Sequence, residues 1–358
     1  MENIEKIAKS FELGGEITKI KENHRGHINS TYFVYCGDKK YVLQKINKNV
    51  FKKPEEVMSN IVYVTEHIAE KLRAAGKNEE SCALHFAKAK DGKYFSLDEN
   101  GDYWRLYGFV EGECYESCET AELFCTVGEA FGEFQQQFAD FDASLLYETI
   151  PNFHNTASRY LDFERAVEEN ISGRAHLAKE EIEFVRNRKA VCDIIVDGIK
   201  NGVFPLRVTH NDTKLNNIIL NDDGFCVIDL DTVMPGSMLY DFGDAIRFGA
   251  SSAPEDETDL SKVFVKTELF DAFTKGYLKG LGGRATKEEI LALPEGARVI
   301  TFETGMRFLT DYLNGDTYFK TAYPEHNIVR ARNQFKLVAD MEGKKAELDA
   351  IVERYITK

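Results

Sequence analysis

A short polar segment near the middle of the chain carries the side chains best suited to chemistry. His210-Asn211-Asp212-Thr213-Lys214-Leu215-Asn216-Asn217 has the spacing H-x-D-x-x-x-x-N, and Asp229 follows on a short apolar strand. Phosphoryl transfer of the kinase type uses one carboxylate to accept or orient the proton of the attacking hydroxyl, while an amide oxygen and a second carboxylate hold Mg²⁺ against the nucleotide phosphates. The pattern therefore predicts Asp212 as the catalytic residue, with Asn217 and Asp229 as the Mg²⁺ ligands.

The residues on either side of Asn217 predict two short hairpin strands. Ile218 to Leu220 and Phe225 to Leu230 are apolar runs, and residues 221–224 between them read Asn-Asp-Asp-Gly, a tight-turn composition. The second strand would deliver Asp229. The alternative interpretation is a polar hairpin whose Asn and Asp side chains only cap turns.

For three further residues, His210, Lys214 and Asp241, the sequence leaves two roles open. We expect His210 to hold the catalytic loop rather than to shuttle protons. Lys214 either reaches the transferring phosphate and offsets its charge or is a solvated loop lysine. Asp241-Phe242-Gly243 spells the metal motif of protein kinases, but no strand delivers it and Asp229 already fills that role. We expect Asp241 to cap the following helix or to brace the catalytic loop.

The elements that must position these residues change in type along the chain. Before residue 111, alternating apolar residues predict strands, and Pro54 begins a helix with Val57, Ile61, Val64 and Ile68 at helical spacing. The strands are expected at residues 31–36, 41–46, 86–89, 94–97 and 104–110. Further on the pattern is helical, with an apolar stripe of Phe124, Val127, Phe131, Phe134 and Phe138 that reads as the buried face of a core helix. Further helices are expected at residues 157–168, 179–199, 260–279, 298–313 and 328–355.

This order of elements predicts an α+β chain with two lobes, as in the protein-kinase-like fold. The expected division is a small β-rich nucleotide-binding lobe at residues 1–108 and a large, mostly helical catalytic and substrate-binding lobe at residues 109–358.

These features resemble those of a known group of enzymes. The Asp-Asn-Asp set without an H-R-D triplet is similar to the aminoglycoside phosphotransferase and choline kinase branch of that fold, and within it to the N-acetylhexosamine 1-kinases. The resemblance runs from about Phe11 to Ile351. The segments that carry it are residues 26–32, 41–47, 207–217, 228–232, 234–237, 241–244, 305–309 and 323–327.

The resemblance implies two groups of binding residues. The acceptor sugar would meet His27, Asp212, Thr232, Arg307 and Tyr318. The alternative for Arg307 is an ordinary salt bridge on a helix. The nucleotide would meet the following residues: Gly26, Ile28 and Asn29 in a turn between strands, Lys45 on the next strand, Lys214, and the backbone of the lobe connection around Tyr107 and Phe109. Strand side chains alternate between faces, so either Gln44 or Lys45 points at the nucleotide, but not both. The carboxylate partner of Lys45 stays open among Glu55, Glu56 and Glu66.

What the resemblance implies about function is an ATP- and Mg²⁺-dependent kinase. It would phosphorylate the anomeric 1-hydroxyl of N-acetylglucosamine or N-acetylgalactosamine by direct in-line transfer. Two alternatives remain: a kinase of the same fold acting on homoserine, choline, methylthioribose or an aminoglycoside, and a non-catalytic nucleotide-binding regulator.

Composition narrows the class of protein. The formal net charge of −15 argues against nucleic acid as a partner, because phosphate contacts need a basic face. No apolar run reaches the length of a membrane span, and the N-terminus lacks the pattern of a signal peptide. The seven scattered cysteines fit reduced thiols better than a disulfide framework. We therefore expect a cytoplasmic enzyme, monomeric or homodimeric, without nucleic-acid or membrane partners.

Overall fold

The computed structural model describes residues 2–118 and 120–356, apart from residues 24–28. The predicted sites at Gly26, His27 and Ile28 therefore lie outside the described residues. The chain divides into two compact units. Unit 1 contains Met1–Cys114, Ser144–Pro151 and Asn216–Met234, and unit 2 contains the remainder. The division thus differs from two contiguous lobes, because two later segments pack with the N-terminal one.

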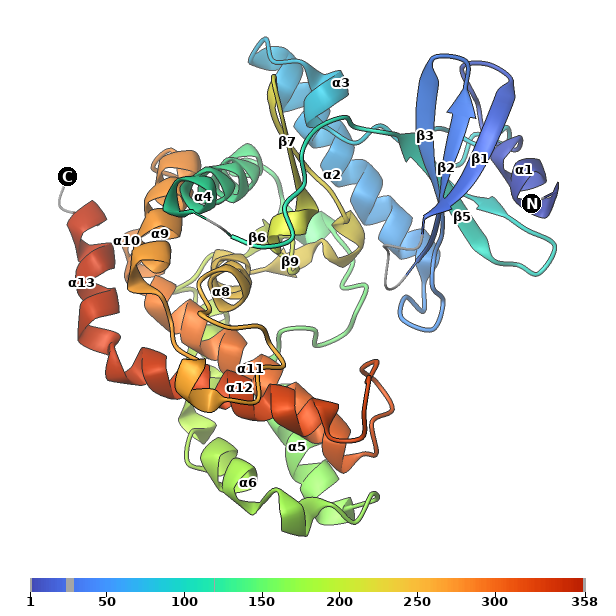
Figure 1. Cartoon of the computed structure of the whole chain (residues 1–358). Coiled ribbons are helices and arrows are strands. Elements are labelled where there is room, and N and C mark those ends of the chain that lie inside the picture. The colour runs from blue at the N-terminus through green and yellow to red at the C-terminus, as the bar shows by residue number, and fades with distance from the viewer. Residues whose placement is uncertain (1, 24–28, 119, 357–358) are drawn as a thin grey trace. The chain divides into compact units, whose positions relative to one another are not determined.

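The main feature of unit 1 is an antiparallel five-stranded sheet in the order β1-β2-β3-β5-β4 (Figure 1). Its strands are β1 (Ile17–Asn23), β2 (Ser30–Cys36), β3 (Lys39–Lys45), β4 (Ser96–Leu97) and β5 (Tyr103–Gly108). The turn between β2 and β3 places Gly37 at φ 57°, a conformation that glycine adopts at low cost. The strand expected at residues 86–89 is wrong. Only isolated bridges form there, from Phe86 to Tyr107 and from Phe11 to Ala89, because this segment does not continue a ladder with β5.

The helices of unit 1 are α1 (Glu2–Ala8), α2 (Pro54–Ala74) and α3 (Glu79–Cys82). The prediction for α2 is confirmed: it begins at Pro54, and the four residues of its predicted apolar face are buried. Asn60, also buried on α2, donates to the carbonyls of Tyr147 and Val233 and accepts from the Tyr147 amide, at 2.8–2.9 Å. These hydrogen bonds explain why two segments distant in sequence belong to unit 1.

The predicted hairpin after residue 217 is confirmed, and it lies in unit 1. Strands β7 (Ile218–Asn221) and β8 (Gly224–Val227) pair around the expected turn, and a single 3-10 turn, η5 (Leu230–Thr232), follows. The second strand is shorter than predicted: it ends at Val227, so Asp229 follows the strand and does not lie on it. Gly112 is held against this hairpin, where an added Cβ would collide with the carbonyl oxygen of Leu220. The chain that leaves the five-stranded sheet therefore packs directly on the hairpin.

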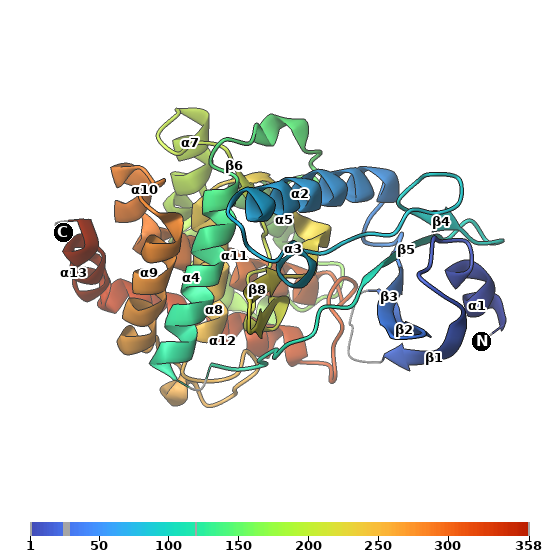
Figure 2. The same ribbon diagram turned by 90° about the horizontal axis from the view of Figure 1, so that it is seen from above.

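Unit 2 is mostly helical and also contains the short strand β6 (Arg207–Thr209) and all of β9 (Met234–Gly236) except Met234. The predicted phenylalanine stripe on α4 is buried as expected. Glycines on α4 and α9 leave no room for a Cβ between the two backbones, and Figure 2 shows these helices side by side. The α-helices are α4 (Ala121–Gln137), α5 (Thr156–Glu169), α6 (Lys179–Arg186), α7 (Ile194–Lys200), α8 (Met238–Gly249), α9 (Thr267–Leu281), α10 (Lys287–Leu291), α11 (Leu293–Leu313), α12 (His326–Gly343) and α13 (Lys345–Ile356).

Three helices expected to be continuous are interrupted. Residues 179–199 form α6, a 3-10 segment (Lys189–Asp193) and α7, and the C-terminal helix breaks at Lys344. The helix expected at residues 260–279 is a 3-10 turn (Leu260–Lys262) followed, after a break, by α9. Apolar spacing persists across each break, so periodicity alone does not reveal it. None of the helices among the described residues has the length and apolar content needed to cross a membrane.

Candidate active site

The loop that carries the predicted catalytic residue Asp212, called the catalytic loop below, follows β6, and Asp241 holds its backbone. Asp241 lies in the first turn of α8 and is buried. It accepts hydrogen bonds from the amides of His210 (3.0 Å) and Asn211 (2.7 Å) and from Nε2 of Gln135 (2.8 Å). The helix is capped instead by Ser237. Of the two roles expected for Asp241, the loop brace is confirmed.

His210 is a structural residue of this loop, as expected. Its ring is fully buried against the edges of Phe131 and Phe134, at 6.0 and 5.9 Å between ring centroids. Its Nδ1 accepts from the amide of Asp212 at 3.3 Å. Asn211, between them, has φ 66°, a left-handed conformation that costs energy in a residue other than glycine. The surrounding hydrogen bonds therefore hold a strained turn that presents Asp212.

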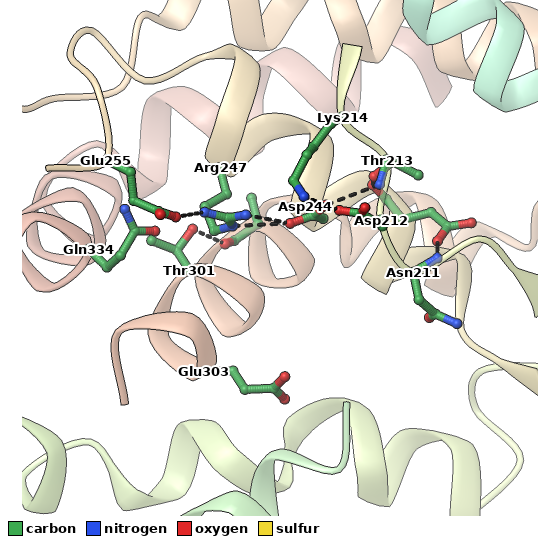
Figure 3. A network of polar contacts seen from close by, with 12 residues as sticks. Asn211, Asp212, Thr213, Lys214, Asp244, Arg247, Glu255, Thr301, Glu303 and Gln334 are labelled. Carbon is green, nitrogen blue, oxygen red and sulfur yellow. Dashed lines mark hydrogen bonds and ion pairs between the residues drawn. The ribbon is translucent and has the colours of Figure 1, made fainter. Parts of the chain in front are cut away.

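Lys214 pairs with the predicted catalytic residue: its Nζ lies 2.7 Å from Oδ1 of Asp212 (Figure 3). Burial would lower the pKa of Lys214, but the negative charges of Asp212 and Asp244 outweigh this effect and raise it. Lys214 is thus a fixed positive charge beside Asp212 rather than a lysine that contacts only solvent. Its contact with a phosphate stays a prediction.

Asp244 is a second brace that sequence reasoning missed. It lies one helical turn after Asp241 on α8, accepts from the Thr213 amide at 3.0 Å, and pairs with Arg247 at 2.8 Å. Arg247 in turn contacts Glu255 at 2.6 Å, so alternating charges extend away from Lys214 (Figure 3). The i, i+3 spacing of the two aspartates was the available signal.

Glycine between these aspartates permits the close packing of α8. A Cβ on Gly243 would collide with the carbonyl of Gly296 on α11. The Asp-Phe-Gly-Asp segment therefore serves helix packing on one side and loop support on the other.

We expect Asp241→Ala to reduce stability before it affects chemistry. The change leaves three buried donors, on His210, Asn211 and Gln135, without their acceptor. Unsatisfied buried donors should lower the free energy of unfolding by roughly 2–4 kcal/mol. Urea unfolding followed by circular dichroism measures this. An unchanged unfolding midpoint would contradict the bracing role.

The predicted acceptor residues Arg307 and Tyr318 lie in unit 2 with Asp212. Arg307 on α11 stands over the rings of Phe153, Tyr318 and Phe319, at 5.3, 5.9 and 5.6 Å from their centroids. Among the described residues no carboxylate lies within ion-pair distance of its guanidinium. Arg307 therefore does not form the ordinary helix salt bridge that was its alternative role.

A buried histidine–glutamate pair links α11, the helix that carries Arg307, to the loop that carries Asp212. Glu303 lies one turn before Arg307 on α11, and its Oε1 is 2.8 Å from Nδ1 of His154. Nε2 of His154 faces the carbonyl of Asn211 at 3.5 Å. Burial would raise the pKa of Glu303, but His154 and Arg307 lower it, so the carboxylate is held ionised. Unit 2 therefore connects α11, which carries Arg307, to the loop that carries Asp212.

The predicted metal ligands Asn217 and Asp229 lie together in unit 1. The amide of Ile228 donates to the carbonyl of Asn217 at 2.9 Å, so Asn217 and Asp229 flank the open end of the β7–β8 hairpin. Asp229 has φ 59°. One amide and one carboxylate supply hard oxygen atoms, and Mg²⁺ takes its other ligands from phosphates and water. These donors fit a nucleotide-bound Mg²⁺. Thr232 lies in η5, just beyond them.

A buried network in unit 1 centres on Asp231, which sequence reasoning did not single out. Its Oδ1 pairs with Arg105 on β5, and its Oδ2 accepts from Asn29 at 2.6 Å. Arg105 also donates to Oε1 of Gln44 on β3 at 2.7 Å. The network ties the sheet to the residue two positions after Asp229. Asn29, a predicted nucleotide-binding residue, is part of this network.

The register of β3 places Gln44, not Lys45, on the face of this network. Gln44 is opposite Arg105 and Lys45 is opposite Trp104, so their side chains lie on opposite faces of the sheet. Lys45 pairs with Asp102 at 3.4 Å. The carboxylate partner of Lys45 is thus Asp102, and not one of the three glutamates at positions 55, 56 and 66. The structure does not bring Lys45 together with Asp229.

The lobe connection offers fewer backbone donors than expected. The Gly108 amide donates to His85 at 3.0 Å and the Phe109 amide donates to Lys40 at 2.9 Å. Tyr107 is paired with Val42 in the sheet, and burial raises the pKa of its phenol. An adenine ring would therefore have to use other backbone groups of this segment.

Comparison with known proteins gives a family match and several similar structures. The model of a phosphotransferase enzyme family matches residues 19–285. A microcompartment-associated aminopropanol kinase aligns over 97% of this chain and 98% of its own, with TM-score 0.59 and 14% identity. An amicoumacin kinase in complex with AMP-PNP, Ca²⁺ and Ami covers 96% and 93%, with TM-score 0.60 and 12% identity. Choline kinase from Cryptosporidium parvum covers 95% and 93%, with TM-score 0.56 and 12% identity.

Proposed function

Because the chain belongs to the phosphotransferase enzyme family, we propose that it is a kinase of a small alcohol substrate with ATP as the phosphoryl donor. The acceptor we propose is N-acetylglucosamine or N-acetylgalactosamine, phosphorylated on the anomeric 1-hydroxyl to give the sugar 1-phosphate. The observation that supports the proposal is the contact in unit 2 between α11, which carries Glu303 and Arg307, and the loop that carries Asp212, through His154 and the carbonyl of Asn211.

Asp212 supplies the base in this mechanism. Its carboxylate accepts or orients the proton of the 1-hydroxyl as the oxygen attacks the γ-phosphorus in line with the departing ADP oxygen. The strained, braced loop holds the carboxylate in one orientation, which lowers the entropy lost on reaching the reactive geometry. Lys214 exchanges its contact with Asp212 for the transferring phosphate and offsets its negative charge.

Residues of unit 1 serve the nucleotide. Asn217 and Asp229 would hold the Mg²⁺ that neutralises phosphate charge. Asn29, which donates to Asp231, would contact the nucleotide phosphates. The roles of Gly26 and Ile28, which lie outside the described residues, stay predictions. Arg105 pairs with Asp231, two positions after Asp229, and we propose that this pair holds the segment that carries Asp229. The side chain of Lys45, which was predicted to bind the nucleotide, lies on the opposite face of the sheet from Gln44 and Arg105.

The acceptor end favours an oxygen-rich, uncharged molecule. Arg307 donates in a planar fork that suits hydroxyl and carbonyl oxygens, and the rings of Phe153 and Tyr318 offer apolar faces to a sugar. The acceptor roles of Thr232, a residue of unit 1, and of His27, which lies outside the described residues, stay predictions. A second candidate, a kinase of another small alcohol such as choline or aminopropanol, is less well supported, because a cationic acceptor would meet the positive charge of Arg307.

The test is a panel of free sugars with ATP and Mg²⁺, followed by ADP release and by phosphorus NMR of the product. N-acetylglucosamine and N-acetylgalactosamine should be substrates, and their products should carry the phosphate on carbon 1. The matched 1-O-methyl glycosides should not react, because their anomeric oxygen has no proton for Asp212 to accept.

Three results separate the parts of the proposal. Rapid phosphorylation of the 1-O-methyl glycoside would show that another hydroxyl of the ring reacts. The protein would then be a sugar kinase, but not a 1-kinase. If choline or homoserine is phosphorylated and none of the sugars is, the proposed acceptor is wrong, but the protein is still a kinase. ATP binding without turnover of any acceptor alcohol would favour a nucleotide-binding regulator.

A further inference from the structure

Arg307 is one of two arginines at the acceptor end that have no carboxylate partner among the described residues. The second is Arg159 on α5, a residue that the sequence motifs did not single out. Its Nε and Nη2 donate to the backbone carbonyl of Phe153, at 3.4 and 3.2 Å. The ring of this same phenylalanine lies 5.3 Å from the guanidinium carbon of Arg307. Phe153 therefore contacts both arginines: its carbonyl accepts from Arg159, and its ring faces Arg307.

The two guanidinium groups repel each other. Burial lowers the pKa of Arg159, and the positive charge of Arg307 lowers it further. Most other arginines that the structure describes are paired with a carboxylate, among them Arg186, Arg188 and Arg247. In a chain of net charge −15, two neighbouring arginines without such a partner form a local positive site that the fold itself does not neutralise.

Glu303 is a buried carboxylate that interacts electrostatically with both arginines, but its oxygens already have partners. Oε1 pairs with His154 at 2.8 Å, and Oε2 accepts from the hydroxyl of Thr156 at 2.6 Å. Glu303 is fully buried, whereas Arg159 and Arg307 are only half-buried. Its charge offsets part of the positive field without pairing with either guanidinium. Since Nε and Nη2 of Arg159 donate to Phe153, Nη1 of Arg159 and the guanidinium of Arg307 are the groups that could donate to a molecule at the acceptor end.

We propose that Arg159 and Arg307 act together as a charge filter that admits neutral N-acylated amino sugars and disfavours sugars with a free, protonated amine. This inference rests on the acceptor site proposed above and deepens it by naming what discriminates at position 2 of the sugar. N-acetylation converts an ammonium group into a neutral amide whose carbonyl oxygen accepts a hydrogen bond. A guanidinium can donate to that oxygen, whereas it repels an ammonium in the same place.

The experiment compares three sugars that differ only at carbon 2: N-acetylglucosamine, glucose and glucosamine. Glucose has a neutral hydroxyl there, so its deficit relative to N-acetylglucosamine measures the lost acetyl contacts. The further deficit of glucosamine relative to glucose measures charge. The assay is run at about pH 6.5, where an amine of this kind is protonated. It reports kcat/KM, or the inhibition constant against N-acetylglucosamine where turnover is slow.

In the unaltered enzyme the glucosamine-to-glucose ratio should lie well below one. Arg159→Gln and Arg307→Gln should each raise that ratio by roughly tenfold, the factor that corresponds to removing about 1.4 kcal/mol of like-charge repulsion. Arg159→Lys keeps the positive charge and should keep the ratio low, even if its altered contact with Phe153 slows turnover. Arg165→Gln is the matched control, because Arg165 is exposed on the same helix and pairs with Asp162. It should leave the ratio unchanged.

Each result decides between the two proposals. If N-acetylated sugars react but the ratio stays low in both glutamine variants, with unchanged melting temperatures, the charge filter is overturned and the sugar kinase stands. If Arg159→Lys raises the ratio as much as Arg159→Gln does, shape rather than charge discriminates, and the filter is again overturned. If no N-acetylated sugar reacts or binds, the proposed acceptor falls and the filter falls with it.

Discussion

Asp212→Asn is expected to retain the fold and to lower kcat by roughly 10²–10⁴-fold, the usual contribution of a positioned general base. The amide has nearly the same shape as the carboxylate but cannot accept the proton of the sugar hydroxyl. The loop should keep its conformation, because its braces contact the backbone: Asp241 accepts from Asn211, and Asp244 accepts from Thr213. Steady-state ADP release, together with the melting temperature, measures the effect.

The same variant separates chemistry from binding. The KM for the sugar should change far less than kcat, because the lost interaction develops mainly in the transition state. Asp38→Asn makes the same chemical change in the exposed turn between β2 and β3 and should leave both constants unchanged. A properly folded Asp212→Asn enzyme with normal kcat would show that another group accepts the proton.

Asp229→Ala is expected to abolish the response of activity to Mg²⁺ and to lower kcat/KM by roughly 10²–10³-fold or more, since it removes the carboxylate that would hold the metal against the phosphates. Asn217→Ala should give a smaller loss, because a neutral amide oxygen binds Mg²⁺ more weakly than a carboxylate does. Calorimetric titration of ATP with and without Mg²⁺ checks this without turnover. The metal should strengthen ATP binding to the unaltered protein and should have little effect on binding to Asp229→Ala.

Asp241→Ala is the control for this metal assignment, since Asp241 carries the letters of the metal motif but is placed as a brace. At a temperature where it is still folded, it should keep the effect of Mg²⁺ on ATP binding. Rescue of Asp241→Ala by excess Mg²⁺, with no rescue of Asp229→Ala, would mean that the two aspartates have been assigned the wrong way round.

Local sequence patterns were sufficient for the parts of this protein that are local in structure. The β7–β8 hairpin joins residues close in sequence, so apolar runs around a turn predicted both strands, and with them the approach of Asn217 to Asp229. The same reasoning separated Asp241 from the metal ligands, because no strand delivers it. The buried faces of α2 and α4 followed from helical periodicity.

Tertiary structure alone decided which distant charges meet. Arg105 and Asp231 are 126 residues apart, and His154 and Glu303 are 149 residues apart. Periodicity shows which face of a helix is buried, but not which carboxylate another element brings to it. Strand register is equally invisible locally, because a shift of one residue exchanges the two faces. That single step placed Gln44 rather than Lys45 beside Arg105. Arg159 and Arg307 converge for the same reason: packing around Phe153 joins two helices that no spacing in the sequence connects.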